Sequence, residues 1–123
     1  MIQVNADGSI ECFWGESGYI DIVPLISENE RYFLEAGEYV VFTVASSRKT
    51  FIRKILTAVD QDDKGVLKAF ISHKDTMGMS IDKYKYDCKL VSPEREEYCT
   101  FIKPALFVIK PGAAKGDGRQ WER

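Results

Sequence analysis

Features that are common in secreted, metal-binding or nucleic-acid-binding proteins are scarce in this chain of 123 residues, which has three cysteines and one histidine. Three cysteines are too few, and odd in number, for a disulfide framework, so free thiols in a reducing cytoplasm are expected. The alternative is a single bridge between Cys88 and Cys99, if neighbouring strands place them opposite each other. His73 has no second histidine with which to share a metal, so we expect it in a surface connection.

A targeting segment and long apolar runs are also lacking. The first residues, MIQVNADGSIE, show neither the basic start nor the apolar stretch of a signal peptide, so secretion by this route is not expected. Apolar runs of only a few residues are too short to cross a bilayer. The net charge of −2 and the pI of about 5.5 argue against a nucleic-acid partner, which would require a basic stripe.

No motif in the sequence amounts to a catalytic or metal site. Residues 15–18 read Gly-Glu-Ser-Gly, but the G-x-S-x-G turn of serine hydrolases fails because Tyr19 follows. The acidic stretch 60–65 looks faintly like a calcium loop, yet an EF-hand alignment would place Lys64 and Ile71 at ligand positions, and neither binds calcium. We therefore expect no catalytic, cofactor-binding or metal residues, no cofactor, and no enzymatic activity.

Strict alternation marks residues 83–91 as the strand around which the chain is organised. One face carries Tyr84, Tyr86, Cys88 and Leu90, and the other carries Lys83, Lys85, Asp87 and Lys89. A period of two is typical of a strand with one buried and one solvated face.

Turn residues divide the remaining chain into further short strands. They are expected at residues 2–5, 9–14, 18–24, 31–35, 39–45, 51–59, 66–71, 98–102 and 106–110. Segment 39–45 is predicted as a central strand covered on both faces. Segment 51–59 is compatible with a helix, but its β-branched content favours a strand. Residues 60–65 are expected to form a hairpin loop, and 72–80 a helical turn opening at Ser72 or Asp75.

These elements predict an all-β fold, namely an antiparallel immunoglobulin-like β-sandwich with one short helical turn. Residues 1–110 are expected to form the single domain. The composition changes at Pro111, and the glycine-rich, charged segment 111–123 is predicted to be a flexible tail.

Several motifs resemble small β-sandwich proteins of phage and prophage tails in Gram-positive bacteria, similar to the N-terminal domain of BppU-type baseplate upper proteins. The matching segments are WGESG at 14–18, GEYVVFTV at 37–44, KDT at 74–76, YKYD at 84–87 and FVIKP at 107–111. The chain departs from that pattern at Glu16 and Glu38, where the family has aspartate, and at Asp82, where it tends to have glycine.

The resemblance implies a structural component of a phage tail, a baseplate or a phage-tail-like bacteriocin. Such a protein is made in the bacterial cytoplasm, is built into a symmetric particle and contacts other tail or baseplate proteins. Trp121 in the tail segment is a candidate assembly contact, because aromatic residues often anchor interfaces. The alternative is a carbohydrate-binding module for host-surface recognition. It requires an exposed row of aromatic residues, for which the candidates are Trp14, Tyr19, Tyr32 and Tyr39.

Overall fold

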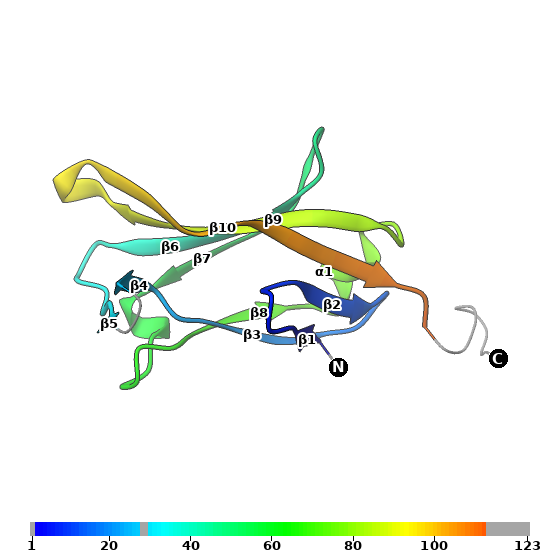
Figure 1. Ribbon diagram of the computed structural model, residues 1–123, viewed down its shortest axis with the longest axis horizontal. Helices are drawn as coiled ribbons and strands as arrows, with labels where there is room; N and C mark the ends of the chain where they lie inside the picture. Colours follow the sequence, from blue (N-terminus) through cyan, green and yellow to red (C-terminus); the bar gives the residue numbers. More distant parts are fainter. Residues whose placement is uncertain (1, 28–29, 113–123) are drawn as a thin grey trace.

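The computed structural model describes residues 2–27 and 30–112 (Figure 1). The predicted tail segment, with Trp121, therefore lies outside the described residues, apart from Pro111 and Gly112. The strands are β1 (Gln3–Val4), β2 (Ile10–Phe13), β3 (Gly18–Ile22), β4 (Leu25–Ser27), β5 (Glu30–Arg31), β6 (Tyr39–Ala45), β7 (Thr50–Thr57), β8 (Leu67–Ile71), β9 (Lys83–Ser92) and β10 (Glu97–Lys110). The helical elements are the α-helix α1 (His73–Met77) and the 3-10 turns η1 (Ala58–Asp60) and η2 (Pro93–Arg95).

Two facing sheets make up the body of the fold, and the prediction of an all-β sandwich is confirmed. The larger sheet has the order β1-β2-β10-β9-β6-β7, and β3 pairs with β8 to form a smaller sheet (Figure 1). All pairs are antiparallel except β2 and β10, which run parallel from Ile10↔Phe107 to Phe13↔Lys110. The strand expected at 39–45 matches β6, which lies between β7 and β9.

The core lies between the inner faces of these sheets. Alternate residues of each strand point inward, as the period of two requires. The buried side chains include Ile20, Ile22, Val40, Phe42, Val44, Ile52, Leu67, Ala69, Ile71, Tyr84, Tyr86, Phe107 and Ile109. Their burial removes a large apolar area from water, which is the dominant favourable contribution to folding.

Strand β9 lies at the centre of this core, as its alternation predicts. Tyr84, Tyr86 and Cys88 are buried, whereas Lys83, Lys85 and Lys89 on the other face are exposed. The ring of Tyr86 lies 5.6 Å from that of Phe42 and 6.5 Å from that of Phe107, measured between ring centroids. Its hydroxyl donates a hydrogen bond to the carbonyl of Gly8. Tyr86 therefore connects the core to the turn of the β1–β2 hairpin.

The prediction of two separate strands at 98–102 and 106–110 is wrong, because β10 is one continuous strand of 14 residues. Its pairing with β9 shifts register between Thr100 and Ile102 and again between Ile102 and Ala105. Pro104 lies within the second irregularity. A residue without an N–H is tolerated at such a place, because the extra residues of a bulge are left out of the ladder.

Two further expectations also need correction. Residues 60–65 do not close a hairpin, because β7 lies at the edge of the larger sheet while β8 pairs with β3 in the smaller one. The strand expected at 31–35 is reduced to β5, ending at Arg31. The N–H groups of Leu34 and Glu35 donate instead to side-chain oxygens of Gln61 and Glu38, each at 2.8 Å. Side chains thus replace the strand partners that this segment lacks.

Helix α1 begins at the expected place, with Ser72 as its N-cap. The Ser72 hydroxyl accepts a hydrogen bond from the N–H of Asp75 at 3.1 Å, and the Asp75 carboxylate accepts one from the N–H of Ser72 at 2.9 Å. Asp75 also forms an ion pair with Lys54 of β7 at 2.8 Å. This reciprocal capping box starts the helix, and the ion pair attaches it to the edge of the larger sheet.

We expect Ser72→Ala to lower the free energy of unfolding by about 1 kcal/mol, the usual cost of losing an N-cap side chain. Urea denaturation measures this change. Ser47→Ala, in the exposed β6–β7 turn, is the control and should change stability by less than about 0.5 kcal/mol. Equal stability of the two variants would show that the cap does not stabilise α1.

Candidate functional site

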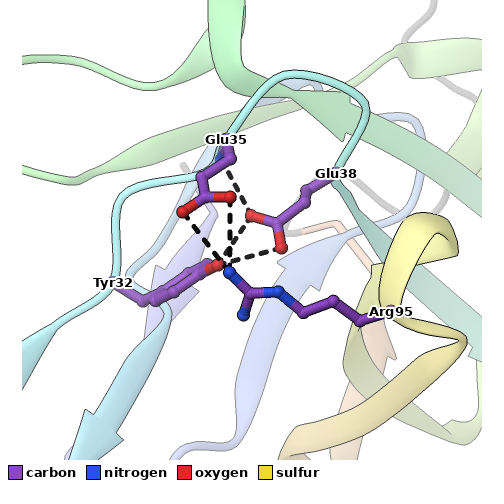
Figure 2. Close-up of polar contacts among 4 residues, drawn as sticks. All are labelled: Tyr32, Glu35, Glu38 and Arg95. Atoms are coloured by element: carbon purple, nitrogen blue, oxygen red, sulfur yellow. Dashed lines mark hydrogen bonds and ion pairs between the residues drawn. The ribbon is translucent and has the colours of Figure 1, made fainter.

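A cluster of four polar residues joins the loop before β6 to the tip of the β9–β10 hairpin (Figure 2). Glu38 is only 5% exposed, and its carboxylate accepts hydrogen bonds from the Tyr32 hydroxyl at 2.7 and 2.9 Å. It also accepts the 2.8 Å bond from the N–H of Glu35. On the outer side of the cluster, Arg95 of η2 lies 3.3 Å from the Glu35 carboxylate. The cluster thus holds two remote segments together.

The protonation states in this cluster are fixed by its hydrogen bonds. Burial alone would raise the pKa of Glu38, but the bonds it accepts from Glu35, Tyr32 and Ser92 outweigh burial and lower that pKa below the ordinary value. Burial and the bond to Glu38 raise the pKa of Tyr32. Near neutral pH, Glu38 therefore stays ionised and Tyr32 stays protonated.

This arrangement is suited to holding the fold rather than to acid–base catalysis. A general acid or base needs a pKa near the working pH, and neither Glu38 nor Tyr32 is shifted towards neutrality. The hollow beside the cluster has a volume of about 20 Å³, which is room for roughly one water molecule. Within the part of the chain that the structure describes, no group of three or more His, Cys, Asp or Glu residues could hold a metal ion.

A more promising feature is an exposed apolar end of the sandwich. Phe13, Trp14, Met77 and Ile81 are all exposed there, and we call these four residues the apolar end. The Trp14 indole N–H donates to the carbonyl of Met79 at 3.0 Å, and Gly15 lies against the side chain of Met77, so the turn after β2 lies against the end of α1.

The apolar end lies where the last strand finishes. Phe13 is the parallel partner of Lys110, and the N–H of Trp14 donates to the carbonyl of Lys110 at 2.9 Å. In Figure 1 the arrowheads of β2 and β10 lie close to α1 on this side of the molecule. Exposed apolar residues that gather in one place mark contact surfaces more often than single exposed residues do.

The aromatic residues proposed for sugar binding do not form one row. Trp14 belongs to the apolar end, while Tyr19 is exposed on the outer face of the small sheet, where its ring lies 5.1 Å from that of Phe70. Tyr39 lies on the outer face of the opposite sheet, and Tyr32 belongs to the polar cluster. A stacking platform made of these four side chains is therefore not formed.

The remaining sequence motifs occupy connections. His73 is the first residue of α1 and is exposed. Residues 15–18 join β2 to β3, a strand-to-strand turn unlike the strand-to-helix turn of a hydrolase. In the acidic stretch, the Asp62 carboxylate accepts hydrogen bonds from the N–H groups of Lys64 and Val66 at 2.9 and 2.8 Å, so it stabilises its own turn. Among the described residues, no helix is long and apolar enough to cross a membrane.

All three cysteines are free, so the alternative of a Cys88–Cys99 bridge is wrong. Cys99 is opposite Leu90 and Cys88 is opposite Ile102, so the two are out of register. Burial raises the pKa of the Cys12 thiol to about 11 and that of the Cys88 thiol to about 12. Only the thiolate is an effective nucleophile, so these two thiols are expected to be inert.

We expect a water-soluble aromatic disulfide at pH 8 to label Cys99 within minutes in the native protein, while Cys12 and Cys88 react only after denaturation. Absorbance of the released thiolate counts the reactive groups, and mass spectrometry identifies them. The variant Cys99→Ser should abolish the rapid phase. Native labelling of Cys88 as fast as that of Cys99 would contradict the buried position of β9.

No family model matches the chain, and no curated protein or solved structure shows significant similarity to it. Function is therefore inferred from the residues and their arrangement, together with the resemblance of the motifs. Sequence reasoning did not identify the polar cluster, because Glu38 and Arg95 are remote in sequence and their meeting depends on the paths of two loops. It did not identify the apolar end either, since that surface combines residues from the end of β2 with residues in and after α1.

Proposed function

We propose that this protein is a structural, non-enzymatic component of a phage tail or phage-tail-like particle, acting through contacts with other tail or baseplate proteins. The observation that carries the proposal is the apolar end. A contact surface next to the end of β10 suits a building block, because a neighbouring subunit can cover Trp14, Met77 and Ile81 while the sandwich itself stays unchanged.

Two other observations support a binding role over catalysis. The polar cluster keeps its carboxylate ionised and its tyrosine protonated, and it leaves room for only about one water molecule. The two-stranded sheet of β3 and β8 also carries an exposed aromatic pair on its outer face, formed by Tyr19 and Phe70. The separation of the proposed sugar-binding aromatics makes the carbohydrate-module alternative the weaker one.

Deletion of the encoding gene in the producing bacterium tests the proposal directly. We expect electron microscopy to show absent or incomplete tail-like particles, and a tagged copy of the protein to restore them and to co-sediment with them. Intact particles without the protein, or a tagged protein that never co-sediments, would contradict the proposal.

Substitutions at the apolar end test the contact surface. We expect Met77→Glu/Ile81→Glu to reduce incorporation of the tagged protein into particles by at least about tenfold, because buried carboxylates at an interface are costly. Val4→Glu/Val59→Glu, at exposed sites on β1 and η1, is the matched control and should be incorporated normally. Equal incorporation of the two would exclude this surface as the contact.

Trp121 is proposed as a second assembly contact, although it lies outside the described residues. A chain lacking residues 113–123 and the variant Trp121→Ala should both be incorporated less efficiently than the full chain. If both are incorporated normally, this segment is not part of the interface.

A further inference from the structure

A groove crosses the outer face of the larger sheet, on the side away from the core. It has a volume of about 320 Å³, and its floor is formed by Tyr39, Val41 and Thr43 of β6. Arg53 of β7 lies along one side, and Lys89 of β9 lies along the other. Val41 is only 8% exposed although it points away from the core, and Tyr39 and Thr43 are half-buried. The prediction that β6 is covered on both faces therefore holds in part. The inner face is buried in the core, whereas the outer face is open to solvent at the groove.

The charge around this groove is mainly positive. Neither Arg53 nor Lys89 forms an ion pair with any other described residue. Lys83 and Lys85 lie on the same face of β9. Asp87, opposite Thr43 and between Lys85 and Lys89, is the single acidic residue on the outer face of β6, β7 and β9. A positive face on a chain whose net charge is −2 is a local feature, and it attracts an anionic partner.

We propose that this groove binds an extended, acidic segment of a neighbouring protein. A segment lying along the seven residues of β6 would span roughly 20 Å at the usual rise of a strand. Its apolar side chains would lie on Val41, and carboxylates of the same segment would reach Arg53 on one side and Lys89 on the other. The proposal rests on the proposed function only in taking the neighbour to be another subunit of the particle.

The arrangement favours a protein segment over a nucleic acid. Binding of single strands usually relies on several aromatic rings that stack with bases, whereas the floor of this groove has one ring, that of Tyr39. The net negative charge of the chain would also oppose a phosphate backbone that extends beyond the groove. The apolar floor and the basic sides match a strand with alternating apolar and acidic residues.

Fluorescence anisotropy with the isolated protein tests this inference. The probe is a labelled peptide of alternating glutamate and valine, and the control peptide has glutamine in place of glutamate. We expect the glutamate peptide to bind the wild-type protein, and we expect this binding to weaken as salt is added. Its affinity for the Arg53→Glu/Lys89→Glu variant should be at least about tenfold lower. Lys64→Glu/Lys74→Glu changes the net charge equally at exposed sites outside the groove and should lose much less.

Three outcomes would overturn the inference. The first is that the glutamate peptide does not bind at concentrations up to about 1 mM. The second is that the two double variants lose equal affinity for the peptide. The third is that a single-stranded oligonucleotide binds more tightly than the peptide, and that only Arg53→Glu/Lys89→Glu abolishes its binding. The single variant Lys89→Gln, which removes one charge without reversing it, should give an intermediate loss. The assay contains no particles, so an absence of peptide binding would not contradict the proposed role in particle assembly. Conversely, normal particles after gene deletion would not contradict peptide binding by the groove.

Discussion

Replacing Phe42 by alanine is expected to lower the free energy of unfolding by about 3–5 kcal/mol, the usual cost of truncating a buried phenylalanine. Phe42 is 0% exposed, lies on β6 between β7 and β9, and packs its ring against that of Tyr86. The loss combines the apolar area no longer buried with the cavity that its neighbours cannot fill. Such a loss is a large part of the 5–15 kcal/mol by which domains are usually stable.

Chemical denaturation followed by tryptophan fluorescence measures this loss. Phe33→Ala removes the same ring from a side chain that is 53% exposed, so it should change stability by less than about 1 kcal/mol. If the Phe42 variant lost no more than the Phe33 variant, the inner face of β6 would not be the centre of the core.

The second large effect is expected from Glu38→Gln, which keeps the shape of the side chain and removes its charge. At pH 7 we expect a loss of about 2–3 kcal/mol, because the bonds from Tyr32 and from the N–H of Glu35 would no longer reach a buried carboxylate. Glu35→Gln is the control. Its carboxylate is exposed and pairs with Arg95 at the surface, so about 1 kcal/mol or less is expected.

The pH dependence of this effect has a definite sign. The pKa of Glu38 is lower in the folded protein than its ordinary value of 4.5, so its contribution is fully present above about pH 4.5 and is lost as the pH falls through the folded-state pKa. Urea denaturation between pH 7 and pH 3 should therefore show the difference between wild type and Glu38→Gln shrinking towards acid. A difference that is constant over this range would contradict an ionised Glu38.

The sequence predicts those parts of the fold that depend on local alternation. The two-residue period of β9 identifies Tyr84 and Tyr86 as core residues, and Ser72 followed by Asp75 marks the start of α1. Prediction fails where a distant partner decides the outcome. The continuity of β10 through Pro104 depends on β9, which accommodates the extra residues of the bulges. The path from β7 to β8 depends on β3, which is the true partner of β8.

The candidate sites were less predictable for the same reason. Glu38 in a Gly-Glu pair looks like an ordinary turn residue, and only the folded chain brings Tyr32 and Ser92 to it. The groove is predictable in part, since the alternation of β9 places its lysines on the solvated face. The groove itself also needs β7, which places Arg53 beside Thr43, while β9 places Lys89 beside Val41.

The parallel pairing of β2 with β10 also affects how the chain folds during synthesis. Ile10 pairs with Phe107, and Phe13 pairs with Lys110, so β2 must wait for a strand made almost a hundred residues later. Until β10 has left the ribosome, the edge of β2 that pairs with it has unpaired backbone groups, and such an edge can pair with other chains. Nascent chains that stall before residue 107 are therefore the ones at risk of aggregation.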